Sequence, residues 1–202
     1  MALKACWHGS GTSQPALCSS WTIARAVDFA LQNGARILNF SLAGPADPLI
    51  ERLLTQALSQ NVIAVAATLQ WQGQPDDIGF PASMDHVIAV VSSDLQGHVH
   101  SPMPGTDQAV LAAPGIEILT TTPQQTYDFL SGSSLAAAHV SGIAALILED
   151  HPNRTPVRVC SLLQTTSQPI GNPNVRPMAM LGIVDACAAL QQLTLRSYCP
   201  TS

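Results

Sequence analysis

The sequence Gly-Ser-Ser-Leu-Ala-Ala-Ala-His-Val-Ser-Gly, residues 132–142, says most about the fold of this chain. Small and apolar residues follow the glycine without interruption, and we expect a helix over residues 134–149. Ser134 stands at its N-terminal end, where backbone N–H groups lack intrahelical partners and the helix dipole is positive. A serine hydroxyl placed there can form an acyl-enzyme, provided that a base and an oxyanion donor reach it.

Outward from this helix, short apolar runs alternate with helical periodicity along the whole chain. We therefore predict an α/β fold with a mostly parallel sheet. The continuous apolar run at 62–67 indicates a strand covered on both faces, and the almost wholly apolar helix at 134–149 predicts burial on all sides. We expect strands at 3–6, 37–40, 62–67, 86–91 and 110–113. We expect further helices at 21–33, at 47–60 with Asp47 as its N-cap, and at 183–193, and one more helix that begins at Pro156.

Length and composition limit the kind of protein. A chain of 202 residues is enough for one domain, 47% of it is hydrophobic, and only 10% is charged. We expect part of so apolar a surface to be covered by another polypeptide. A net charge of −5 without any basic run excludes nucleic acid as a partner.

Nothing in the sequence indicates a membrane segment or a leader. The longest apolar runs, such as 143–148, are much shorter than the roughly 20 residues of a membrane span. The first eight residues lack the apolar core of a signal peptide. The cellular compartment therefore stays open.

Five cysteines give an odd count without metal-type spacing, namely Cys6, Cys18, Cys160, Cys187 and Cys199. The simplest interpretation is free thiols packed as small apolar residues, although disulfides remain an alternative. We find no acidic cluster that demands calcium, and we expect neither a metal nor another cofactor.

Several segments, in order, resemble the subtilisin-like serine proteases. Residues 132–142 resemble the nucleophile motif G-T-S-M-A-x-P-H-V-[SA]-G, with Ala138 in place of its proline. Six further matches in the same order are far more specific than any one of them, and the likeness covers essentially the whole chain. The others are 35–44 with D-V-I-N-M-S-L-G-G, 62–70 with V-V-V-A-A-A-G-N, 80–82 with [YF]-P-A, 86–90 with V-I-A-V-G, 112–115 with A-P-G and 182–185 with G-x-[IV]-[ND].

This resemblance implies a three-layer fold and a set of site residues. Ser134 takes the position of the nucleophile of peptide-bond hydrolysis, and a peptide or protein is the implied substrate. Gln70 occupies the oxyanion-donor position, where the family has asparagine, so its amide is displaced by one methylene. The substrate-binding positions are Ser41, Leu42 and Ala43 on the edge that pairs with substrate, and Thr68, Leu69, Ala82 and Ser133 around the specificity pocket.

The family's other two catalytic residues have no counterpart. The aspartate of D-[ST]-G and the histidine of H-G-T-H precede the segment at which this chain starts, and residues 3–6 align with the family's third strand. We therefore expect residues 1–202 to be a single partial domain that lacks the first two strands. Because the family's first strand lies between the third and fourth, its loss leaves a gap beside residues 37–40.

The histidines of this chain do not replace the missing base. His139 lies five positions after Ser134, about 140° around the helix, and we expect it to pack in the core. His8 begins a His-Gly-Ser-Gly-Thr stretch, but it follows the third-strand segment instead of preceding it. His98 and His100 have a metal-pair spacing without a third ligand, so we expect exposed loop histidines.

Three functions are compatible with these observations. The chain is either part of a serine endopeptidase that is inactive until an N-terminal subtilase fragment supplies the base, or a pseudoprotease that binds extended peptide or a partner chain. The altered oxyanion-donor pair Leu69-Gln70 favours the pseudoprotease. The third alternative is an incomplete gene product. A chain with an open sheet is expected to rearrange at residues 3–6, to be marginally stable, or to associate with another polypeptide or itself.

Overall fold

The computed structural model describes residues 1–7, 16–69, 78–99, 109–122, 125–170 and 182–193. Its centre is a six-stranded sheet in the order β3-β4-β5-β6-β10-β9. The pairs from β3 to β10 are parallel, and β9 closes the far edge antiparallel to β10. The strands are β3 (Ile37–Phe40), β4 (Ile63–Ala67), β5 (Ile88–Ser93), β6 (Val110–Pro114), β9 (Gln168–Pro169) and β10 (Gly182–Ile183).

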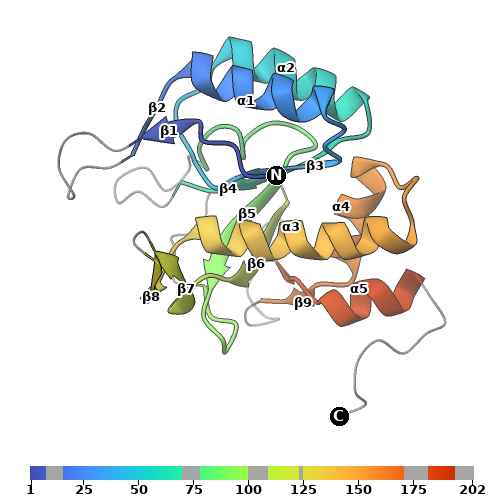
Figure 1. Ribbon diagram of the computed structural model, residues 1–202. Helices are drawn as coiled ribbons and strands as arrows, with labels where there is room; N and C mark the ends of the chain where they lie inside the picture. Colours follow the sequence, from blue (N-terminus) through green and yellow to red (C-terminus); the bar gives the residue numbers. More distant parts are fainter. Residues whose placement is uncertain (8–15, 70–77, 100–108, 123–124, 171–181, 194–202) are drawn as a thin grey trace.

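Helices cover both faces of this sheet and give three layers (Figure 1). Helices α1 (Ser20–Gln32) and α2 (Pro48–Ser59) lie on one face, and α3 (Ser133–Asp150), α4 (Pro156–Thr165) and α5 (Ala186–Leu193) lie on the other. The period-two alternation of strand side chains separates two cores: Ala64 and Ala66 of β4 face α1 and α2, whereas Ile63 and Val65 face α3. The α/β class and the buried strand at 62–67 are thereby confirmed.

Side-chain caps explain where the helices begin. Ser19 forms a capping box with Thr22 ahead of α1, and Asp47 accepts hydrogen bonds from two backbone N–H groups of the first turn of α2. Thr155 caps α4, whose first residue is Pro156. The predicted roles of Asp47 and Pro156 are confirmed. None of the described helices is both long and apolar enough to cross a membrane.

The N-terminal strand predicted at 3–6 is wrong in place and in partner. Cys6–Trp7 (β1) pairs antiparallel with Leu17–Cys18 (β2), and this pair forms a separate sheet. A disulfide joins Cys6 to Cys18, and Cys187 is also disulfide-bonded, so the interpretation of these three cysteines as free thiols is wrong. Cys160 is a free thiol, as expected. A short apolar run predicts a strand but not its neighbour, and here the neighbour is local.

Helix α3 is not buried on all sides, contrary to the prediction. Ala138, His139, Gly142, Ala145 and Leu146 are exposed along one stripe of it. The sheet and α5 cover its other faces. The hydropathy of a helix shows how apolar its residues are, but it does not show which of its faces other segments cover.

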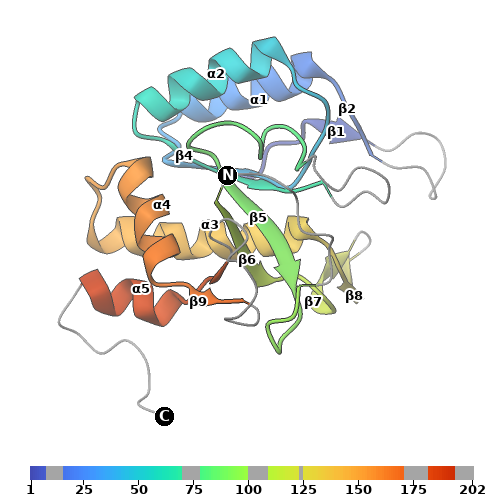
Figure 2. The same cartoon turned by 180° about the vertical axis from the view of Figure 1, so that it is seen from behind.

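Two further features escaped the prediction. A hairpin of β7 (Ile118–Thr122) and β8 (Thr126–Leu130) projects beside the N-terminal end of α3 and forms its own sheet (Figure 2). The last helix begins at Ala186, because Gly182–Ile183 extends the sheet as β10. On the opposite edge, β3 pairs only with β4 among the described residues. Among these residues β3 is therefore an open edge of the sheet and not one side of a gap between two strands, and the loss of a strand from this position stays a prediction.

Candidate active site

Close packing of the segments before Ser134 holds it at the start of α3. Gly132 is the N-cap, and its N–H donates to the carbonyl of Gly115 at 2.7 Å. A methyl group on Gly115 would lie 2.8 Å from the Gly132 oxygen and 2.7 Å from Cβ of Ser92. Only glycine at position 115 allows this approach, which fixes where α3 begins.

The Ser134 side chain bonds to the backbone of the neighbouring strand end. Its Oγ donates to the carbonyl of Ser41 at 3.1 Å, and Oγ of Ser41 donates to the Ser134 carbonyl at 2.8 Å. A peptide carbonyl accepts a hydrogen bond, but it does not remove the proton as a general base does. Ser134 is half-buried and held in an unactivated state.

Two residues that the sequence reasoning missed extend this contact. Asn39 donates from Nδ2 to Oγ of Ser41 at 2.9 Å, and Ser141 donates to Oδ1 of Asn39 at 3.0 Å. This polar chain ties β3 and the residue after it to α3 at Ser134 and again at Ser141. The available signal was a polar residue at the solvent-facing position of an otherwise apolar strand, since Asn39 is exposed between buried Leu38 and Phe40.

No described imidazole or carboxylate hydrogen-bonds Ser134 Oγ. His139 is exposed, and its Nδ1 lies 3.0 Å from the Leu135 carbonyl within α3, so its predicted core packing is wrong. His98 is exposed and contacts Asp94 at 3.1 Å. His8 and His100 lie outside the described residues.

The segment with Ser41, Leu42 and Ala43 follows β3 toward α3. A pair of backbone hydrogen bonds between Gly44 and Phe80, 2.9 and 3.0 Å long, holds its far end. Gly79 has a φ of +74°, and a methyl group there would lie 2.9 Å from Cβ of Leu69. Half-buried Leu69 therefore packs directly against this turn.

The other predicted pocket positions are buried. Ser133 donates to the Thr68 carbonyl at 2.7 Å, and the Thr68 hydroxyl donates to the Val90 carbonyl at 3.1 Å. Ala82 is 0% exposed. In this structure Ser133 and Thr68 connect α3 to the end of β4 and to Val90 within β5, and their contact with substrate stays a prediction. Gln70 lies outside the described residues.

A groove of about 550 Å³ lies along the open edge of the sheet. Residues 1–3 and Ala5 form one wall, β3 forms the opposite wall, and α1 contributes Ile23 and Val27. Most of the lining is apolar. The groove therefore offers both unpaired strand backbone and apolar surface beside the segment that contacts Ser134.

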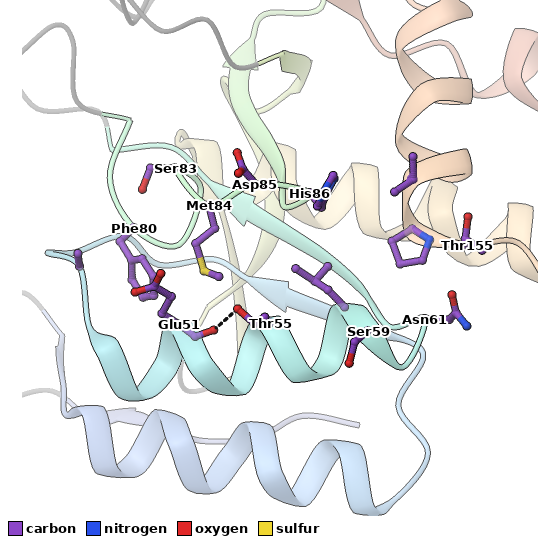
Figure 3. Close-up of a pocket in the computed structure, with 14 residues that line it drawn as sticks. Glu51, Thr55, Ser59, Asn61, Phe80, Ser83, Met84, Asp85, His86 and Thr155 are labelled. Atoms are coloured by element: carbon purple, nitrogen blue, oxygen red, sulfur yellow. Dashed lines mark hydrogen bonds between the residues drawn. The ribbon is translucent and has the colours of Figure 1, made fainter.

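A larger cavity of about 710 Å³ lies elsewhere, between α2, the turn before β5 and the start of α4 (Figure 3). Glu51, Asp85 and His86 line it together with Thr155. Ser134 does not line it. Among the described residues, no group of three or more His, Cys, Asp or Glu side chains gathers to hold a metal.

The shifted acidic groups cap helices and belong to the scaffold. The Ser20 hydroxyl and the N–H of Ile50 lower the pKa of Asp47. The N–H of Ala188 is the main cause of the lowered pKa of Asp185. Burial raises the pKa of the Cys160 thiol, which lowers its fraction of reactive thiolate.

Comparison with known proteins agrees with this geometry. The profile of the Subtilase family matches residues 1–184. Subtilisin DY of Bacillus licheniformis is 32% identical over 167 residues, which cover 81% of this chain and 58% of that protein. Subtilisin NAT of Bacillus subtilis subsp. natto is 34% identical over 158 residues, 76% of this chain and 41% of that protein.

Solved structures show the same likeness. The prenylagaramide maturation protease PagA superposes with a TM-score of 0.77 at 28% identity, over 91% of this chain and 71% of that one. Fervidolysin from Fervidobacterium pennivorans, a keratinolytic enzyme related to subtilisin, superposes with a TM-score of 0.74 at 26% identity, over 84% of this chain and 28% of that one. This chain spans less than two thirds of the length of the subtilisins compared above. It belongs to the subtilase family and has the fold of a subtilisin-like serine protease domain.

Proposed function

We propose that this chain supplies the nucleophile-bearing part of a serine endopeptidase, with Ser134 as the nucleophile, and that polypeptide outside residues 1–202 supplies the base. The observation that carries this proposal is the Ser134 hydroxyl, which stands at the first turn of α3 and donates to a peptide carbonyl. Nothing among its described partners accepts its proton. The isolated chain is then inactive.

The groove beside β3 is the proposed docking site for this added polypeptide. A strand added there pairs with the free backbone edge of β3 and buries Leu38 and Phe40 more deeply. A strand running parallel to β3 ends near Ser41, the residue that contacts Ser134. The added polypeptide thereby approaches the nucleophile from the side that the present chain leaves open.

The reaction then needs one local change at Ser134. Its Oγ leaves the Ser41 carbonyl, which costs about 1 kcal/mol for one neutral hydrogen bond, and donates to the added base. Attack on the scissile carbonyl transfers the proton to this base and forms the acyl-enzyme, which water hydrolyses. Backbone N–H groups at the first turn of α3 stabilise the oxyanion, with Gln70 as the proposed side-chain donor.

A serine-directed phosphonate tests this proposal. The isolated chain is expected to remain unlabelled, and a fusion that places the D-[ST]-G and H-G-T-H part of Subtilisin DY before Met1 is expected to be labelled. Ser134→Ala in the fusion is the matched control and should abolish labelling. Labelling of the isolated chain that Ser134→Ala removes would show that no outside base is needed.

A second candidate is a non-catalytic module that binds extended peptide or a partner chain in the retained groove. Leu69-Gln70 at the oxyanion position favours it, because an active enzyme retains its oxyanion donor. A fusion that binds peptide but is neither labelled nor turns peptide over supports this candidate. Concentration-dependent dimers without added polypeptide would instead identify a second copy as the occupant of the β3 edge.

A further inference from the structure

The Cys6–Cys18 disulfide is the main fastening of the N-terminal segment. It links β1 to β2, each only two residues long, and these strands pair with no other described strand. A two-stranded ribbon is marginal in water even at greater length. Backbone pairing alone is therefore too weak to hold this segment.

This segment is also the outer wall of the groove. Residues 1–3 and Ala5 face β3 across it. A further tie is one hydrogen bond of 2.7 Å from the Thr22 hydroxyl to the Ala5 carbonyl. Met1 is 77% exposed and Leu3 is 38% exposed, so packing contributes little. Whether the groove has two walls or one depends on what holds Cys6.

We infer that the Cys6–Cys18 disulfide is a redox latch that keeps the N-terminal wall of the groove in place. The inference rests on the proposed function in that the groove is where added polypeptide docks. Cys18 is exposed and therefore open to a dithiol reductant. One thiolate of the reductant attacks a latch sulfur to give a mixed disulfide, and its second thiol releases the other cysteine. The latch gains two electrons and two protons as two thiols, and the reductant becomes a disulfide.

The size of the effect follows from loop closure. The two cysteines are 12 positions apart, and a cross-link of that span raises the population of the closed arrangement by roughly 100-fold. Reduction removes this factor and leaves the two-residue pair and the Thr22 hydrogen bond. The oxidised chain presents a preformed groove with two walls, and the reduced chain presents the β3 edge alone.

Hydrogen exchange of the isolated chain tests the latch. We compare the oxidised wild type, the wild type in dithiothreitol, Cys6→Ser/Cys18→Ser and the control Cys160→Ser. The double variant matters because Cys187 is also disulfide-bonded and dithiothreitol reduces both bridges. Amides of residues 5–7 should exchange up to about 100-fold faster in the reduced and doubly substituted chains. Cys160→Ser should match the oxidised wild type.

Hydrogen exchange in β4 distinguishes a disulfide that holds only the N-terminal segment from one that stabilises the whole fold. Its amides should keep their exchange rates in all four samples. Unchanged exchange at residues 5–7 in the double variant would overturn the inference, and so would equal loss of protection in β4. The measurement uses neither Ser134 nor a partner, so a fusion that fails to label refutes the proposed function and leaves this result standing.

Discussion

Gly115→Ala tests whether close backbone packing holds the start of α3. The added methyl group would lie 2.7 Å from Cβ of Ser92, 2.8 Å from the oxygen of Gly132 and 3.1 Å from Cβ of Ala136. Two of these distances are shorter than real Cβ contacts, and the atoms belong to the backbone or lie next to it. Either β6 or the segment before α3 must move.

We expect a cost of about 2 kcal/mol, within the usual range of 1–3 kcal/mol for an overpacked core. The reduced freedom of the unfolded chain offsets about 0.5 kcal/mol of it. The net loss of roughly 1.5 kcal/mol lowers the urea midpoint by about 0.5–1 M. Urea unfolding followed by circular dichroism measures both the midpoint and the slope.

Gly142→Ala is the matched control, because nothing lies within 4 Å of a methyl group there and the site is exposed on the same helix. Alanine inside a helix is better than glycine by about 0.5–1 kcal/mol, so this variant should gain stability. Wild-type stability in Gly115→Ala, or an equal loss in both variants, would refute the packing argument at the base of α3.

Four further substitutions probe the scaffold by the same urea assay. Ser19→Ala removes the capping box of α1 and should cost about 1 kcal/mol; no loss would mean that the cap is replaced by water. Leu163→Ala should cost about 2–5 kcal/mol of folding stability because Leu163 is 0% exposed. Leu146→Ala, on the exposed stripe of α3, should change the stability little. Similar losses in the two variants would contradict the two burial assignments. The Ala188 N–H lowers the pKa of Asp185 in the folded chain, so the stability that this carboxylate contributes is present above its unfolded pKa near 4 and is lost as pH falls through its folded pKa. Asp185→Asn should therefore flatten the acid side of the plot of stability against pH. An unchanged plot would exclude this cap.

The sequence predicted the parts of the fold that local patterns encode. The apolar run at 62–67 specified a fully buried strand, since a strand covered on both faces carries no polar alternation. Asp47 and Pro156 marked helix starts by capping chemistry that acts within one turn. Ser134 at the N-terminal end of a helix followed from the same local reasoning.

Features that depend on neighbours were predicted poorly. The strand expected at 3–6 pairs instead with β2, because a short apolar run does not specify its partner. His139 lies on an exposed stripe of α3 although its surroundings in sequence are apolar. The Cys6–Cys18 bridge depends on two strands lying in register, which spacing along the chain does not show.

The sequence by itself determined the α/β architecture, the family and the helix on which Ser134 stands, because periodicity, caps and ordered motifs are properties of neighbouring residues. Only the tertiary structure decided what the Ser134 hydroxyl bonds to, since Ser41 is 93 positions away. It also decided that β3 is an open edge with a groove beside it. Hydrogen-bond partners and exposed edges arise when distant segments meet, so they are set by packing and not by local sequence.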